Sequence, residues 1–164
     1  ENRGYFKNGR LNPIRKIKKI KQEKDILLLS LFNVGTNPER ILINDIIGDN
    51  SQVVIPDRKN KLDYLSYIQR SKFNLCPEGN GPDTHRVWES LMLKSIPIMI
   101  KNNFSKQLTD YNIPILLIDD WYKLREVDKD KFNTFYENNS QKLETFNYVH
   151  FSYWENKFNQ YLDE

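Results

Sequence analysis

The chain has 164 residues, of which 38% are hydrophobic, 13% aromatic and 29% charged. This composition is typical of one soluble globular domain and excludes an intrinsically disordered chain. No apolar run reaches the roughly 18 residues that a membrane helix needs, and because residues 1–24 are basic we expect no secretory signal peptide among them. The single cysteine, Cys76, excludes an internal disulfide and a multi-cysteine metal site. Because it stands in an apolar run, we expect a buried structural thiol.

The N-terminal segment is basic, with nine lysines and arginines against two glutamates in residues 1–24. A segment of this kind can bind nucleic acid or anionic lipid. Asn12 and Pro13 instead resemble a helix start, and isoleucines follow them at every third position. This pattern favours a surface helix whose lysines lie in water, so we expect no nucleic-acid partner.

Short apolar runs alternate with helical patterns from Ile26 to Asp119. The runs that predict buried strands are Ile26–Phe32, Gln52–Pro56, Phe73–Cys76, Ile96–Ile100 and Ile113–Asp119. The intervening helices are expected from Pro38 onward, from about Lys61 to Ser71, from Pro82 to Lys94 and from Phe104 to Asp110. Alternation with uninterrupted apolar strands predicts an α/β fold: a Rossmann-like, doubly wound parallel sheet of about five strands with right-handed crossovers.

Two aromatic-rich helices are expected to close the chain. The first carries Phe132, Phe135 and Tyr136, and the second carries Trp154, Phe158, Tyr161 and Leu162. Their aromatic side chains are expected to pack in the core or at an interface. We therefore expect a single domain over residues 1–164, with a basic helical lead-in (1–25), an α/β core (26–119) and C-terminal helices (120–164).

A doubly wound sheet binds its ligands beyond the carboxyl ends of its strands. Two loops with polar residues are expected there, Asn33–Arg40 after the first strand and Pro77–Arg86 after the third. In the helix that begins at Pro38, the residues expected to face the core are Ile41, Leu42, Asp45 and Ile46.

The second loop has the residues of an anion-binding turn. Gly79, Asn80 and Gly81 allow a ligand to approach the backbone closely. Gly81 or Asp83 can cap the helix that follows, with Pro82 near its first position. The open N–H groups of such a helix start, together with the helix dipole, favour a phosphate group.

Arg86 can donate to a diphosphate, and Glu89 can accept from the hydroxyl pair of a ribose. Thr36 and Arg40, in the other loop, are expected to reach the same phosphates. On a helical wheel Arg86, Glu89 and Ser90 fall opposite the apolar residues, which are Val87, Trp88, Leu91 and Met92. The alternative is a surface ion pair between Arg86 and Glu89.

His85 is a candidate base or phosphate donor, and it can also simply pair with Glu89; the catalytic residue is otherwise unassigned. No spacing of His, Cys and carboxylates resembles a zinc site, and neither a P-loop nor a dinucleotide motif is present. We therefore expect no metal and no cofactor. Asp119 and Asp120 can bind a hydroxyl or a cation, or can form a strand-ending turn.

The segment "SKFNLCPEGNGPDTHRVWESLMLKSIPIMI" resembles the signature of exostosin-like glycosyltransferases. The matching residues are Pro77, Gly79, Gly81, Arg86, Trp88, Glu89, Ile96, Pro97 and Ile98, and the branch with Gly-Asn-Gly-x-Asp-Thr-His-Arg-x-Trp-Glu adds Asn80, Asp83, Thr84 and His85. The sequence departs from the family at Glu78, where proline or a basic residue is common, and at Lys94, where glycine is frequent. About thirty residues match closely, so this signature is more specific than an isolated glycine motif.

The resemblance implies the C-terminal, nucleotide-sugar-binding lobe of a GT-B glycosyltransferase. It implies that Glu89 holds the ribose and Arg86 the diphosphate, and that transfer needs no metal because arginine and helix N–H groups neutralise the leaving phosphate. A complete enzyme of this type has a second lobe that presents the acceptor. We expect either the donor lobe of a longer protein or a shortened relative that binds without catalysing.

The expected function is transfer of a sugar from a nucleotide-diphosphate sugar to a hydroxyl of a glycan or glycoconjugate. The alternatives are a non-catalytic nucleotide-sugar or carbohydrate-binding module and a receiver- or flavodoxin-like interaction domain. The sequence leaves the sugar, nucleotide base, acceptor, stereochemistry and cellular compartment undetermined.

Overall fold

The structure is a computed structural model that describes residues 12–48, 50–57, 60–147, 152–153, 155–156 and 160. Its strands are β1 (Ile26–Leu29), β2 (Val53–Val54), β3 (Ser71–Leu75), β4 (Ile96–Ile100) and β5 (Leu116–Ile118). Its α-helices are α2 (Asn12–Lys18), α3 (Glu39–Ile47), α4 (Lys61–Arg70), α5 (His85–Met92), α6 (Asn103–Asp110) and α7 (Lys129–Glu144). Two short 3-10 helices, η1 (Val34–Thr36) and η2 (Trp121–Leu124), follow β1 and β5.

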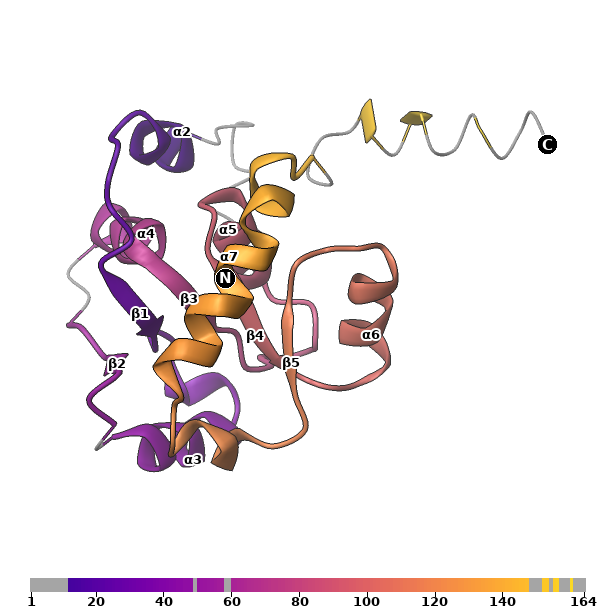
Figure 1. Cartoon of the computed structure of the whole chain (residues 1–164). Helices are drawn as coiled ribbons and strands as arrows, with labels where there is room; N and C mark the ends of the chain where they lie inside the picture. Colours follow the sequence, from indigo (N-terminus) through magenta and orange to yellow (C-terminus); the bar gives the residue numbers. More distant parts are fainter. Residues whose placement is uncertain are drawn as a thin grey trace.

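The five strands form one parallel sheet in the order β2-β1-β3-β4-β5 (Figure 1). The predicted Rossmann-like α/β fold is therefore confirmed. After β1 the chain adds β2 on one side and β3 on the other, so the winding direction reverses between β1 and β3. Ligands of open α/β sheets bind beyond the carboxyl ends of the strands at such a switch point.

The two faces of the sheet are covered by different helices, with α7 in front and α4 and α5 behind in Figure 1. Phe73 of β3 points toward α7, where its ring centroid lies 5.0 Å from that of Phe132 and 6.0 Å from that of Tyr136. The next residue, Asn74, points to the opposite face and donates to Ser90 of α5. This alternation follows from the two-residue period of a strand.

The predicted basic helix is present as α2 and packs on α4 (Figure 1). Ile14 and Ile17 are buried, whereas Ile20 lies beyond the end of the helix and is 52% exposed. The buried apolar stripe of α2 therefore ends at Ile17 and not at Ile20 as expected. Among the described residues, no helix is both long enough and apolar enough to cross a bilayer.

The predicted core face of α3 is wrong. Ile41 is 54% exposed and Leu42 43% exposed, whereas Arg40, Ile43 and Ile47 are buried. The buried positions follow the spacing i, i+3 and i+7, and an arginine occupies the first of them. The apolar side chains of α3 thus do not by themselves define the side that faces the sheet.

Helix α7 matches the first predicted C-terminal helix, and its aromatic residues cover Phe73. The second predicted helix carries its apolar pattern on residues outside the described part of the chain.

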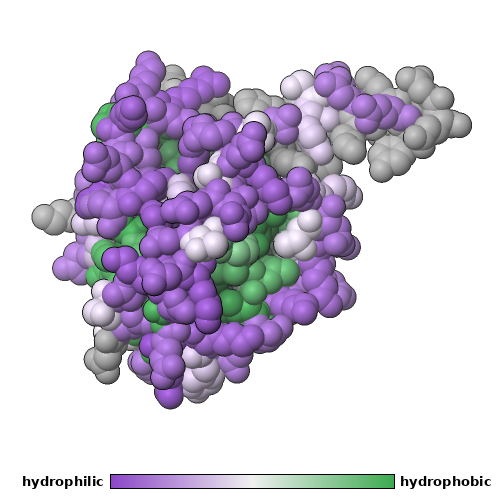
Figure 2. Space-filling model, viewed as in Figure 1, coloured by the Kyte–Doolittle hydropathy of each residue, from purple (hydrophilic) through white to green (hydrophobic). Residues whose placement is uncertain are grey.

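Figure 2 shows an apolar area beside β5 and toward α6, surrounded by hydrophilic side chains. Strand β5 is at the edge of the sheet, and its Leu116 and Leu117 are half-buried.

Candidate functional site

The switch-point site comprises residues 30–40, which follow β1, and residues 76–89, which follow β3. Strand β1 ends at Leu29 and not at Phe32 as predicted, so Ser30 and Phe32 belong to this site. Both segments lie at the carboxyl ends of adjacent, hydrogen-bonded strands. The sequence-based prediction that these two loops lie next to each other is therefore confirmed.

Arg40 joins the two loops. Its side chain donates to the backbone oxygens of Asn33 at 2.8 Å, Glu78 at 2.8 Å and Pro77 at 3.2 Å, and to the hydroxyl of Thr36. Arg40 is only 4% exposed. Arg40 and Thr36 were predicted to reach phosphates, but in the structure the donors of Arg40 hold the two loops together.

The two glycines of the second loop have different surroundings. A Cβ atom at Gly79 would lie 3.1 Å from Nη2 of Arg40, whereas one at Gly81 would have nothing within 4 Å. The Gly79 N–H donates to the Gly81 oxygen at 3.1 Å, and Asn37 donates to the Gly79 oxygen at 3.3 Å. Gly79 is therefore packed against Arg40, while Gly81 and the exposed Asn80 form the open side of the turn.

Helix α5 begins at His85, later than predicted, with Thr84 at the N-cap position. The prediction that Gly81 or Asp83 caps the helix is wrong, because Asp83 instead accepts a hydrogen bond from the Trp88 indole at 2.7 Å. Thr84 makes no side-chain cap, and its buried hydroxyl has no partner among the described residues. Side chains cap the starts of α4, α6 and α7, through Asn60, Asn102 and Asp128. The first turn of α5 therefore lacks a side-chain acceptor.

Arg86, in that first turn, is 5% exposed, and its Nε and Nη1 atoms are buried without an acceptor among the described residues. Its guanidinium carbon lies 5.8 Å from the ring centroid of Phe32, and that of Arg40 lies 5.7 Å from the same centroid. Burial, and then the charge of Arg86, lowers the pKa of Arg40.

Within the described part of the chain, neither arginine forms an ion pair with a carboxylate. Buried donors are normally satisfied, and an unsatisfied one costs about 1–3 kcal/mol. Two neighbouring cations, unsatisfied donors and an uncapped helix start all favour the same occupant, which is an anion.

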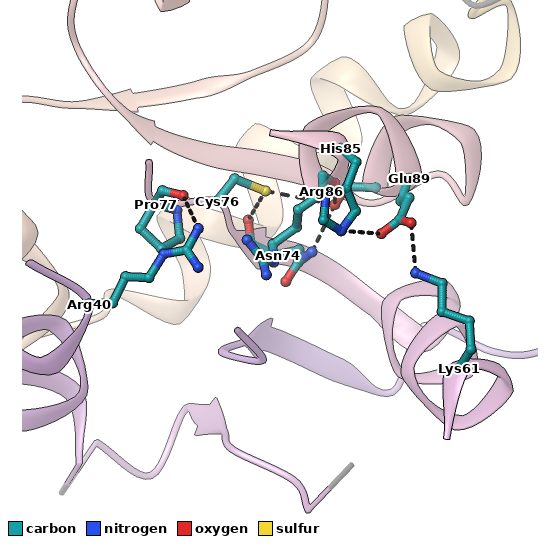
Figure 3. A network of polar contacts seen from close by, with 9 residues as sticks. Arg40, Lys61, Asn74, Cys76, Pro77, His85, Arg86 and Glu89 are labelled. Carbon is teal, nitrogen blue, oxygen red and sulfur yellow. Dashed lines mark hydrogen bonds and ion pairs between the residues drawn. The ribbon is translucent and has the colours of Figure 1, made fainter. Parts of the chain in front are cut away.

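The helical wheel placed Arg86 and Glu89 on a side away from the core, but the side chains of both are buried. The alternative ion pair between them is also not formed within the described region. Glu89 is 2% exposed, and its Oε1 atom accepts from Lys61 of α4 at 2.8 Å (Figure 3). Sequence reasoning missed Lys61 because it lies 28 residues from Glu89 and carries no local signal.

His85 lies beside the same carboxylate, with its Nε2 atom 4.0 Å from Oε2 of Glu89. Its side chain is 41% exposed. Burial lowers the pKa of His85 below its ordinary value; Glu89 opposes this shift, and the neighbouring cations add to it. The imidazole is therefore mainly neutral at pH 7. In Figure 3 these groups form a row from Arg40 to Lys61, with Arg86 between them.

Below this row, β3 contributes Asn74 and the chain continues to Cys76. Asn74 is fully buried and donates to the Ser90 hydroxyl at 2.8 Å, while its Oδ1 atom has no partner among the described residues. Cys76 is buried, and burial raises the pKa of its thiol to about 12. The predicted burial of this thiol is confirmed.

Glu78, where the sequence departs from the exostosin-like signature, has its carboxylate at the start of α6. The Asn102 amide donates to it at 2.6 Å, and Asn102 also forms a capping box with Ser105 at the start of α6. The loop after β3 is therefore fixed from two sides, by Arg40 through its backbone and by Asn102 through Glu78.

Asp119 and Asp120 form a strand-ending turn. Asp119 accepts from Lys123, and Asp120 caps η2 by accepting from the Tyr122 N–H. Over the described residues, no three His, Cys, Asp or Glu side chains are grouped closely enough to hold a metal ion. The second histidine of the chain, His150, lies outside the described residues.

No protein-family model matches the chain, and no curated protein matches its sequence.

Proposed function

We propose that the chain binds the diphosphate of a nucleotide sugar at the switch-point site and is the donor-binding lobe of a glycosyltransferase. The observation that carries this proposal is Arg86, a buried guanidinium with two unsatisfied donors at an uncapped helix start. A diphosphate supplies several acceptor oxygens and negative charge to one position, which matches this demand.

The charge of the site also favours a multiply charged anion. Arg40 and Arg86 contribute two positive charges, and Lys61 and Glu89 neutralise each other at 2.8 Å. The carboxylates of Glu39, Glu78 and Asp83 accept hydrogen bonds from Trp121, Asn102 and Trp88, and among the described residues none of them pairs with Arg40 or Arg86. The diphosphate of a sugar nucleotide carries two negative charges, so it balances the two arginines better than a single carboxylate does.

In the proposed reaction, the switch-point site stabilises the leaving group. When the sugar is transferred, negative charge accumulates on the departing nucleoside diphosphate. Arg86 and the N–H groups of α5 are fixed donors for that charge, and fixed donors need no reorganisation during the reaction. His85, neutral and half-exposed, is the candidate proton acceptor for the attacking hydroxyl. The acceptor is proposed to be presented by a second lobe.

One observation favours a second candidate, a module that binds a nucleotide sugar without turnover. The carboxylates in the described part of the switch-point site are all bonded within the protein: Glu39 to Trp121, Glu78 to Asn102, Asp83 to Trp88 and Glu89 to Lys61. A carboxylate base for the acceptor is thus not available from these residues. Consumption of a sugar nucleotide in the presence of a panel of glycan acceptors separates the two candidates.

Calorimetric titration with nucleoside diphosphates, their sugars and inorganic pyrophosphate tests the binding proposal. The Arg86→Ala variant is expected to bind the preferred nucleotide more than about a hundredfold more weakly, because two charge-assisted hydrogen bonds are lost. Arg70→Ala is the matched control, since Arg70 pairs with Asp25 on the surface. Unchanged affinity in Arg86→Ala refutes the site, and binding of pyrophosphate without any nucleotide restricts it to simple anions.

A further inference from the structure

The surface of α2 and of the segment that follows it is strongly basic. Five of the seven residues from 15 to 21 are exposed cations, which form the basic patch: Arg15, Lys16, Lys18, Lys19 and Lys21. None of them forms an ion pair within the described part of the chain. Cations in the last turn of a helix stabilise the helix dipole, but Lys19 and Lys21 lie beyond the end of α2. The dipole therefore does not account for the whole patch.

The charge of the chain is divided unevenly along the sequence. Residues 1–24 contain nine lysines and arginines and two glutamates, which give a net charge of +7. The whole chain carries +3, so residues 25–164 carry −4. A basic segment on an otherwise acidic protein produces a field that turns the basic side toward an anionic surface.

Two further lysines add positive charge where the basic patch meets the end of α5. Burial, and then the charge of Lys94, lowers the pKa of both Lys18 and Lys24. Lys94 itself pairs with Glu144 of α7. Neighbouring lysines repel one another, so an anion placed on the patch relieves an unfavourable interaction.

An apolar side chain lies in the middle of the basic patch. Ile20 is 52% exposed, whereas Ile14 and Ile17 are buried. An isoleucine between exposed lysines suits the surface of an anionic bilayer, where the lysines contact lipid headgroups and the apolar side chain reaches the acyl boundary. Proteins that bind single-stranded nucleic acid stack the bases on aromatic side chains, and residues 15–21 include no aromatic residue. The composition of the patch therefore favours a membrane over nucleic acid.

The basic patch lies at the edge of the sheet opposite the switch-point site (Figure 1). Gln69, at the end of α4, donates to the backbone oxygens of Ile17 at 3.2 Å and Ile20 at 2.9 Å. Lys24 donates at 2.8 Å to the backbone oxygen of Ser71, the first residue of β3. These contacts lie at the amino end of β3, whereas the switch-point loops follow the carboxyl ends of the strands. A surface bound to the patch therefore leaves the switch-point site accessible.

We propose that the basic patch is a docking surface for an anionic membrane, with its five cations on the lipid headgroups and Ile20 in the bilayer interface. This inference is independent of nucleotide binding, because it rests on a different edge of the sheet. Each lysine or arginine near an anionic lipid surface strengthens binding about fivefold. The combined effect of four lysines is on the order of several hundredfold.

Co-sedimentation of the intact chain with lipid vesicles tests the inference. The probe is a vesicle of phosphatidylcholine with about one third phosphatidylserine, and a vesicle of phosphatidylcholine alone is the reference. The wild type is expected to bind only the anionic vesicle. Binding is expected to weaken as the salt concentration rises above about 0.1 M, because salt screens exposed charges.

Two fourfold variants with the same net charge separate the patch from the charge of the whole protein. Lys16→Gln/Lys18→Gln/Lys19→Gln/Lys21→Gln is expected to bind the anionic vesicle at least about a hundredfold more weakly than wild type. The control removes four exposed lysines far from α2, as Lys106→Gln/Lys123→Gln/Lys129→Gln/Lys131→Gln. The control is expected to bind within about threefold of wild type, since the field of exposed charges falls off within a Debye length.

The Ile20→Asn variant distinguishes a bilayer from other polyanions. It is expected to bind the anionic vesicle about fivefold more weakly, because a half-exposed isoleucine no longer leaves water. The salt dependence of binding is expected to stay the same, since no charge is removed. Duplex DNA at the same phosphate concentration is the comparison.

A wild type that does not bind the anionic vesicle at about 0.05 M salt would overturn the inference. So would a control variant that loses as much affinity as the patch variant, or an Ile20→Asn variant that binds the vesicle as tightly as wild type. Tighter binding to duplex DNA than to the anionic vesicle would also overturn it, and would assign the patch to nucleic acid.

Discussion

The two buried arginines of the switch-point site are expected to have opposite effects on stability. Arg86→Met removes two buried donors that have no acceptors, each of which costs about 1–3 kcal/mol. Methionine keeps the apolar stem, and the loss of the cation–π contact with Phe32 subtracts about 1 kcal/mol. The free energy of unfolding of the ligand-free protein is therefore expected to rise by about 1–5 kcal/mol.

Arg40→Met is the matched comparison, because Arg40 is equally buried but fully bonded. It loses four hydrogen bonds and leaves backbone oxygens of both loops without donors. Its free energy of unfolding is expected to fall by at least about 3 kcal/mol. Methionine at either position removes the same charge, so the difference between the variants isolates the effect of satisfied donors.

Urea unfolding at pH 7, followed by the fluorescence of the buried Trp121, measures both changes. A loss of stability in Arg86→Met as large as that in Arg40→Met would refute the reasoning. It would mean that Arg86 contributes to the fold, so its unsatisfied donors could not be attributed to a binding site.

Three further predictions concern other parts of the chain. Lys94 has a φ of 61°, so Lys94→Gly is expected to unfold with about 1 kcal/mol more free energy than Lys94→Ala, as measured by urea titration. Burial, and then Lys94, lowers the pKa of Lys24 to about 7. Between pH 7 and about 10 the unfolded chain thus binds a proton that the folded chain has released, and stability is expected to rise with pH in wild type but less in Lys24→Met. Cys76 is expected to react with a thiol reagent only on unfolding, and rapid labelling of the folded protein would contradict its burial.

Local signals explain which parts of the fold could be predicted. Each strand of the sheet overlaps a short run of mainly apolar residues, so all five were predicted, although their ends shifted by up to three residues. Helix caps such as Asn60 and Asn102 depend on residues two or three positions away, and α4 and α6 were placed to within one residue. The position of the two switch-point loops could be predicted from the order of these strands and helices alone.

The parts that failed depend on contacts between distant residues. A helical wheel assigns charged side chains to solvent, but α5 is packed on both sides, against the sheet and against α4. The burial of Arg40 was not predicted, although its position in line with Ile43 and Ile47 was a usable signal. The Lys61–Glu89 pair had no such signal, since only the folded chain brings α4 and α5 together.

The contacts of Arg40 also constrain where the chain can accept additional residues. One guanidinium binds carbonyls on both loops, so an insertion in either loop displaces acceptors that a single side chain must reach at the same time. The turn between α6 and β5 is bonded more locally: the N–H groups of Asn112 and Ile113 donate to backbone oxygens of α6, Tyr111 is half exposed, and Asn112 already has a left-handed backbone conformation. A peptide tag or a fused domain is therefore best inserted at Asn112, where it leaves the geometry of the switch-point site intact.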